Sequence, residues 1–357
     1  MTTLQMHCET SGLNHYLYVW NNNTSGWDLI TSTVFEMKPF QGLTLTNNST
    51  NGGIIYDFPC AIVGNVNANL DLVDGWNSFS NSYTAYADIA AYLEGILEHY
   101  NDDIEGTIYT YKKAQETTTE ESWNQISTAD VRENELEDPS LLKLEPMQAF
   151  IIRKMTAKTV MGSINYEESV WNPAMGTTGQ KAPRRIMDMN KVVINLVDAQ
   201  GNEGRFTIRE AAEFTADFDN GYDATLYEST SKFNFYAATD YSNQFQIATD
   251  DIEGQVLTLA TKDETSFTMS FSNVRGEKMA LRDNLTGDVI EMTEGNVYNF
   301  MANANEVSER FTVVSAAKAP TAIENAAAKA KAAKFINKGQ VVLQNNGRMF
   351  NVLGVEL

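Results

Sequence analysis

Short apolar runs alternate with polar turn residues along most of this chain. The turns recur roughly every ten residues, and the runs between them are rich in β-branched and aromatic side chains, which is typical of antiparallel β-structure. We predict one hairpin over residues 192–209 and another over 279–292, with 297–301 following as a third strand. A last hairpin is predicted over 340–352, around the turn Asn346-Gly347.

A helical period interrupts this pattern once, over residues 86–100. Ile89, Leu93, Ile96, Leu97 and Tyr100 recur at the spacing that places them on one face of a helix. We therefore expect one short amphipathic helix, which packs across one end of the first of two predicted β-sandwiches.

The first 158 residues contain an internal duplication. Segments 16–20, 27–31 and 38–42 recur in the same order as 107–111, 123–127 and 145–149. Each copy carries a tryptophan in its second strand and a proline before its third strand. We expect the copies, 17–45 and 108–153, to pair within one pseudo-symmetric sandwich. The tryptophans are predicted to be core anchors, namely Trp20, Trp27, Trp76 and Trp123.

Composition changes mark four regions. Prolines 173 and 183 and the run Gly-Thr-Thr-Gly at 176–179 place a boundary near residue 158. The predicted regions are a β-sandwich over 1–158, a second β-sandwich over 159–315, an Ala/Lys-rich linker over 316–333 and a C-terminal tail over 334–357. The predicted fold class is all-β, with two antiparallel sandwiches of jelly-roll or immunoglobulin-like type.

Charge and composition exclude several classes of function. The chain of 357 residues has a formal net charge of −21, so nucleic acid and anionic membrane surfaces would repel it. No apolar stretch approaches the length of a transmembrane segment. Cys8 and Cys60 form no zinc-binding pattern, and whether they pair is open. The N-terminus lacks the features of a signal peptide, so an exported protein would need a leader upstream of this chain.

The C-terminal residues carry a family resemblance. Residues 321–325, 334–340 and 346–354 form an apolar strand, an Asn-Gly turn, an aromatic-Asn step and a final glycine. This order resembles the C-terminal tails of surface and secreted proteins exported by the type IX (Por) secretion system. The tail residues that carry it are Phe335, Gly339, Gly347, Phe350, Asn351 and Gly354.

The preceding segments are similar to the β-rich region before such tails. They are 74–77, 81–85, 146–150, 218–224 and 309–311, although Ser80-Asn81-Ser82 replaces the usual Gly-Asn-Pro. The resemblance implies transport across the outer membrane by the type IX machinery and a location outside the cell or on the outer-membrane surface. It implies no activity.

We predict no catalytic residues. The three histidines form no HExxH pair, and no Gly-x-Ser-x-Gly, Walker or Rossmann motif occurs. Asp217, Asp219 and Asp223 with Gly221 loosely resemble a calcium loop but lack its bidentate glutamate. The alternative is a turn in which these aspartates cap backbone N–H groups. Calcium is therefore the only cofactor under consideration.

Aromatic residues near turns are candidates for carbohydrate stacking. The candidate ligand-binding residues are Tyr83, Trp171, Trp20 and Asn21. The leading hypothesis is a non-enzymatic extracellular module, a stalk or adhesin, whose partners are the secretion machinery and glycans or host matrix proteins. The alternatives are a carbohydrate-binding module of a secreted enzyme and, third, a hydrolase with two facing carboxylates.

Overall fold

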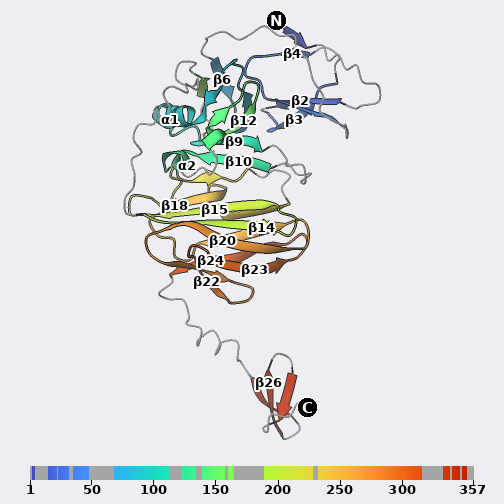
Figure 1. Cartoon of the computed structure of the whole chain (residues 1–357), viewed down its shortest axis with the longest axis vertical. Coiled ribbons are helices and arrows are strands. Elements are labelled where there is room, and N and C mark those ends of the chain that lie inside the picture. The colour runs from blue at the N-terminus through green and yellow to red at the C-terminus, as the bar shows by residue number, and fades with distance from the viewer. Residues whose placement is uncertain are drawn as a thin grey trace.

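A computed structural model describes thirteen segments of the chain. They are residues 2–4, 15–21, 23–31, 35–47, 68–112, 122–133, 139–156, 160–164, 189–227, 232–315, 333–337, 340–345 and 348–351. The described residues form mostly strands in antiparallel sheets, so the predicted all-β fold is confirmed. Figure 1 shows two stacked β-rich units, which we call the first unit (residues 1–164) and the second unit (residues 189–315), followed by a small C-terminal sheet.

Two principal sheets form the first unit. A three-stranded sheet has the order β3-β2-β5, and a four-stranded sheet has the order β10-β9-β12-β7. The strands of these sheets are β2 (His15–Asn21), β3 (Gly26–Leu29), β5 (Leu43–Asn47), β7 (Gly75–Ser80), β9 (Thr107–Lys112), β10 (Ser122–Ser127) and β12 (Ala149–Lys154). Three two-stranded ladders add β1 (Thr2–Leu4) with β4 (Phe35–Met37), β6 (Ala68–Leu72) with β13 (Val160–Ile164), and β8 (Ala87–Asp88) with β11 (Lys143–Leu144).

The duplication seen in the sequence is repeated in strand order and register. Trp20 pairs with Trp27 in the three-stranded sheet, and Tyr111 pairs with Trp123 at the matching position of the four-stranded sheet. Likewise Tyr18 pairs with Thr44, and Tyr109 pairs with Ile151. The two copies belong to separate sheets. That these sheets form one pseudo-symmetric sandwich stays a prediction. A single isolated bridge, Gln41 with Phe79, links the two sheets along their described strands.

The turn before the third strand is also duplicated in detail. Phe40 and Met147 occupy the same place in the two copies, and both have positive φ, 60° and 68°. In each turn a glutamine side chain accepts a backbone N–H, from Lys38 to Gln41 and from Glu145 to Gln148. Gln41 follows Phe40, and Gln148 follows Met147. Each glutamine therefore helps to hold a positive φ that is uncommon for residues other than glycine.

The predicted helix forms as α1 (Ile89–Tyr100). It begins at Asp88, whose carboxylate accepts the N–H groups of Ala90 and Ala91. Its apolar face, including Leu93 and Ile96, packs into the first-unit core together with strands of the four-stranded sheet. A second helix, α2 (Thr128–Arg132), and a 3-10 turn, η1 (Pro139–Leu142), were not predicted, because elements this short show no periodicity.

One sheet of eleven strands forms the second unit, in the order β22-β21-β24-β19-β17-β18-β15-β14-β20-β23, with β16 paired to β18. Its strands are β14 (Asn190–Asp198), β15 (Glu203–Glu210), β16 (Ala224–Thr225), β17 (Phe233–Ala238), β18 (Asn243–Thr249), β19 (Val256–Thr261), β20 (Thr265–Arg275), β21 (Met279–Asp283), β22 (Val289–Glu291), β23 (Val297–Ala302) and β24 (Val307–Ser315). Both halves of the sheet contribute to one apolar core, for example through Phe206, Phe267 and Phe311.

Both predicted hairpins of this unit are present, as β14–β15 and β21–β22. The predicted third strand is present as β23, but it pairs with β20 rather than with β22. The side-chain pattern of a strand shows which residues face the core and leaves the pairing partner undefined, so the sequence could not locate this strand in the sheet.

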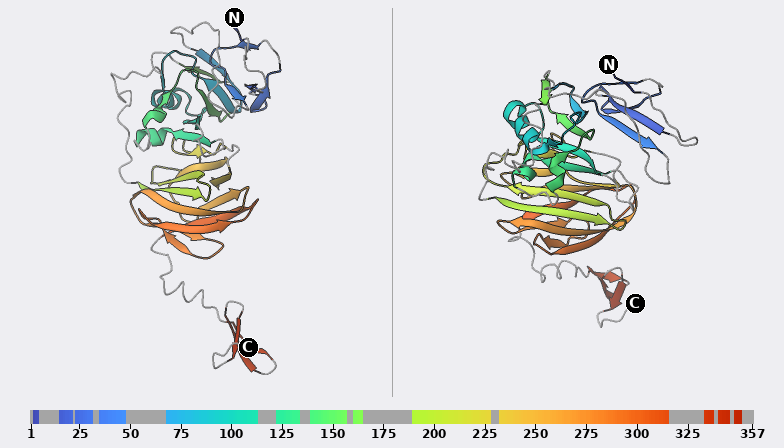
Figure 2. Two further views of the ribbon diagram at one scale, coloured as in Figure 1. Left: turned by 45° about the vertical axis from the view of Figure 1, so that its right-hand side comes forward. Right: turned by 45° about the horizontal axis from the view of Figure 1, so that its top comes forward.

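The C-terminal residues form a separate three-stranded sheet of β25 (Ala333–Asn337), β26 (Gln340–Asn345) and β27 (Arg348–Asn351). This sheet contains the predicted hairpin and one additional strand, β25. In the described part of the chain these three strands pair only with one another. Both views of Figure 2 show the sheet beyond the second unit, at the opposite end from the first unit.

Candidate functional site

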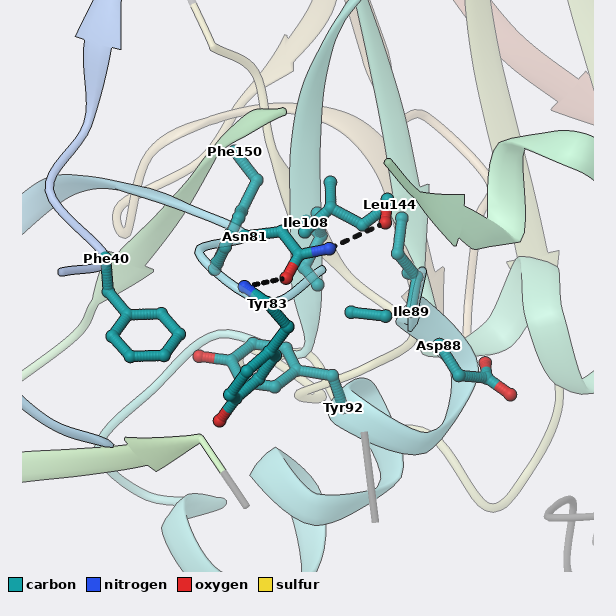
Figure 3. Close-up of a pocket in the computed structure, with 10 residues that line it drawn as sticks. Phe40, Asn81, Tyr83, Asp88, Ile89, Tyr92, Ile108, Leu144 and Phe150 are labelled. Atoms are coloured by element: carbon teal, nitrogen blue, oxygen red, sulfur yellow. Dashed lines mark hydrogen bonds between the residues drawn. The ribbon is translucent and has the colours of Figure 1, made fainter. Parts of the chain in front are cut away.

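A small apolar pocket lies in the first unit (Figure 3). Its walls include Phe40, Tyr83, Tyr92 and Phe150, and its volume of ≈ 20 Å³ suits one water molecule or methyl group. Its main polar group is already engaged, because the Asn81 amide donates to the carbonyls of Ala85 and Leu144 and its carbonyl accepts the N–H of Tyr83. The pocket is therefore a packing defect of the core rather than a substrate site.

The richest polar chemistry lies where the second unit contacts the first. A loop before β16, residues 214–223, reaches the C-terminal end of α1. The Asn220 amide donates to the carbonyls of Asn101 (2.7 Å) and Ile104 (2.8 Å), and its oxygen accepts the Gly106 N–H at 2.6 Å. One asparagine thus satisfies three backbone groups of the other unit.

Gly221 is required beside this asparagine. It has φ +85°, and a Cβ there would lie 2.9 Å from a Leu97 methyl carbon. Its carbonyl accepts the N–H of Ala129 at 2.8 Å. The sequence Asn220-Gly221 therefore permits a close backbone approach that a side chain would block.

A buried carboxylate, Glu105, lies next to this loop. Its oxygens accept the Thr225 N–H at 2.7 Å and the Thr225 hydroxyl at 2.8 Å, and the Arg153 guanidinium lies 3.5 Å away. The Tyr109 hydroxyl contacts both Glu105 and the Thr225 carbonyl. Burial raises the pKa of Glu105, and the Thr225 hydrogen bonds and the Arg153 charge partly offset this effect.

A second charged cluster lies beside α2. Asp130 and Glu133 of the first unit face Lys191 and Arg209 of β14 and β15, with Arg209 bonded to Glu133 at 2.9 Å and to Asp130 at 3.3 Å. Burial opposes ionisation of Asp130, but Arg205 and Arg209 outweigh it and hold the pKa of this carboxyl below its ordinary value. Both carboxylates are therefore ionised at neutral pH, because the pKa of Glu133 is lowered as well.

Lys191 has an unusual environment for a lysine. Its side chain is buried, and burial together with the neighbouring Arg209 lowers its pKa to about 7, although Glu133 and Asp130 favour the charged form. The charge of Lys191 thus changes near neutral pH.

Apolar contacts complete the interface. Tyr109 and Ile151 of the four-stranded sheet pack with Ala224, Leu226 and Phe245 of the second unit. Tyr227 lies edge-on to the rings of Trp76 and Trp123, at 4.9 and 5.0 Å between centroids. The interface therefore combines an apolar patch with desolvated charges.

The three predicted calcium residues lie within this loop, and two of them, Asp219 and Asp223, act as turn-capping groups. The Asp219 carboxylate accepts the Thr215 N–H at 2.7 Å, and Asp223 accepts the N–H groups of Asp219 and Ala248, each at 2.6 Å. Burial, with the nearby negative charges of Asp219 and Glu105, raises the pKa of Asp223 to about 7. Across the described residues, no group of three or more His, Cys, Asp or Glu side chains is arranged to hold a metal ion.

The candidate carbohydrate residues are not brought together. Tyr83 is only 2% exposed and packs against Phe40, so its prediction as an exposed loop residue is wrong. Trp20 is buried as predicted for an anchor, and Asn21 donates to Asp28 at 2.7 Å. Trp171 lies outside the described residues.

The other anchors are only partly buried. Trp76 and Trp123 pack against the interface cluster, and Trp27 packs edge-on to Trp20 at 5.1 Å. The prediction of a buried anchor thus holds for Trp20, whereas Trp27, Trp76 and Trp123 are half-buried.

Several other predictions fall on residues that the structure leaves undescribed. They concern Cys8, Cys60, the linker region 316–332 and the tail residues Gly339, Gly347 and Gly354. Phe335 lies in β25, and Phe350 and Asn351 lie in β27. Within the described ranges, the helices fall short of the length and apolar character that a membrane span needs.

The residues that join the two units were not predicted from the sequence. They are Glu105, Asp130, Glu133, Lys191, Arg209 and Asn220, each polar and separated from its partner by many positions. Only the Asn220-Gly221 pair carried a local signal, as a turn.

Comparison of the chain with protein families, curated proteins and solved structures gives no match.

Proposed function

We propose that this chain is a non-enzymatic module of the bacterial cell surface. In this proposal its two β-rich units form a stalk or adhesin-like spacer, and residues 334–357 are a tail that the type IX secretion machinery recognises. The observation that carries the proposal is the buried interface between the units, which fixes one unit on the other.

A spacer must transmit position from one end to the other, so its units must not pivot freely. Interfaces between domains of one chain are commonly polar and permit relative motion. Here Glu105, Asp130, Lys191 and Arg209 are each almost fully removed from solvent at the junction. Separation would expose an apolar patch and leave these groups without their partners, which opposes pivoting.

The tail hypothesis draws support from the separate C-terminal sheet. An address that a receptor recognises must be presented apart from the body of the protein. The strands β25, β26 and β27 form a sheet of their own, and this arrangement agrees with the resemblance to sorting tails.

The tail is tested by transport of a reporter. We would fuse residues 316–357 to a periplasmic fluorescent protein in a bacterium with a type IX system and measure surface fluorescence. The matched control carries the same residues with the order of 334–357 scrambled. We expect surface delivery of the native fusion alone, and the proposal fails if deleting 334–357 from the full chain leaves its delivery unchanged.

The carbohydrate-binding alternative needs exposed, coplanar aromatic rings. Burial of Trp20 and Tyr83 gives it no support at those residues. Binding of the full chain to arrays of glycans and host matrix proteins, with and without calcium, tests ligand recognition directly. Binding that disappears when an exposed aromatic residue is substituted would favour the alternative over the spacer.

A further inference from the structure

One face of the three-stranded sheet is aromatic and partly open to solvent. Tyr16, Tyr18 and Trp20 alternate along β2, and Trp27 and Leu29 lie opposite Trp20 and Tyr18 on β3. Tyr16 is 38% and Leu29 46% exposed, and Tyr18 and Trp27 are partly exposed. We call these five residues the first aromatic face, which lies in the blue sheet at the side of the first unit (Figure 2).

The duplication gives this face a counterpart in the same molecule. Tyr18 and Trp27 match Tyr109 and Trp123 in strand order and register. In the four-stranded sheet the counterpart face is covered, since Tyr109 is fully buried against the second unit. The two copies therefore share a tyrosine and a tryptophan at matching positions, and along the described chain only the pair in the four-stranded sheet is covered.

The occupant of the counterpart face shows which chemistry fits. Leu226 packs in the cluster with Tyr109, Tyr227 lies edge-on to Trp123, and the Thr225 carbonyl accepts the Tyr109 hydroxyl. On the first aromatic face Tyr18 supplies the matching hydroxyl.

We propose that the first aromatic face docks a β-rich module of a neighbouring protein through a loop of the same chemistry as residues 222–227. Such a loop places a leucine and a tyrosine over the tryptophans and a backbone carbonyl near the tyrosine hydroxyl. This inference goes beyond the spacer proposal, because it assigns to the chain a binding surface and a kind of partner. It does not depend on the C-terminal tail.

The experiment uses the full chain labelled with ¹⁵N at the tryptophan indoles, which gives one NMR signal for each of the five tryptophans. The signals are assigned with Trp→Phe variants. The probe is a capped synthetic peptide of residues 217–227, and the control peptide carries Leu226→Ala and Tyr227→Ala. A short flexible peptide binds weakly, with a Kd on the order of 1 mM, because its ordering opposes binding.

We expect the native peptide to shift the Trp20 and Trp27 signals, while Trp76 and Trp123 stay unchanged because the chain's own loop covers them. Leu29→Glu should weaken this binding by about tenfold, since it places a charge on the apolar face. The matched control is Tyr86→Glu, because Tyr86 is similarly exposed, at 45%, and lies outside the face.

Three results would overturn the proposal. The first is the absence of any shift of Trp20 and Trp27 at millimolar peptide. The second is equal binding of the control peptide or of the Leu29→Glu chain, with its fold verified by circular dichroism. The third is a concentration-dependent shift without peptide, which would identify a second copy of the chain as the occupant.

Discussion

Replacing Asn220 by alanine should weaken the docking of the two units while leaving each unit folded. The substitution removes hydrogen bonds to Asn101, Ile104 and Gly106. A net hydrogen bond contributes roughly 0.5–1.5 kcal/mol, and a buried N–H left without an acceptor costs about 1–3 kcal/mol. The bond to Asn101 is exposed and counts for little, so we expect a loss of about 2–3 kcal/mol, close to a hundredfold change in the docking equilibrium.

The distribution of tryptophans provides the assay. Trp20, Trp27, Trp76 and Trp123 lie in the first unit and residues 189–315 contain no tryptophan, so tryptophan fluorescence reports mainly the first unit and the interface, whereas far-ultraviolet circular dichroism reports both units. In urea the two transitions of the native chain should coincide, because the docked units unfold together. In Asn220→Ala the fluorescence change should move to lower urea and separate from the circular dichroism change.

The matched control is Asn299→Ala. Asn299 is an exposed residue of β23 and accepts a single hydrogen bond, from the Thr268 hydroxyl at 3.0 Å. Its substitution should change the free energy of unfolding by less than about 0.5 kcal/mol. If Asn220→Ala loses no more than this control, or if its two transitions still coincide, the loop does not hold the units together.

Two further substitutions and one pH dependence follow from the same interface. Gly221→Ala should lower the thermal midpoint much more than Gly287→Ala, since both have positive φ but only the first added Cβ would meet Leu97; equal losses would contradict the close approach. Asp223 has a pKa of about 7 in the folded chain against 3.8 for an ordinary aspartate. Its contribution to the free energy of unfolding should therefore be fully present below pH 4 and be lost as the pH rises to 7, which urea unfolding over this pH range measures. The pKa of Lys191 is lowered to about 7 in the folded chain, so the free energy of unfolding in urea should rise between pH 7 and 10. Lys191→Met should remove this rise; an unchanged pH profile would contradict the assigned environment.

Local patterns in the sequence predicted the elements whose causes are local. The α1 helix follows from apolar spacing, and the β14–β15 and β21–β22 hairpins follow from turn residues between alternating strands. The duplication was visible because equivalent turns need the same residues, as in the two proline-containing turns at Phe40 and Met147. In each of these cases a short stretch of chain determines its own conformation.

Pairing and burial depend on distant residues, and there the sequence was insufficient. Tyr83 follows a strand in a polar segment typical of an exposed loop, yet it is buried because Phe40, 43 positions earlier, packs against it. The strand β23 shows the same limit, because its alternation is satisfied equally well beside β20 or beside β22. A charged residue such as Glu105 looks solvated in the sequence until the second unit covers it.

The interface residues illustrate why a duplicated sequence need not give duplicated contacts. Tyr109 and Tyr18 occupy the same register, but Glu105 and Arg153 have no charged equivalents at the matching positions, which hold Asn14 and Thr46. A buried carboxylate is tolerated only where a cation and backbone donors surround it, so the first copy cannot reproduce the charged part of the junction. It retains the aromatic part alone. A module that docks on the first aromatic face should therefore bind through apolar contact and hydroxyl bonds, with little dependence on salt.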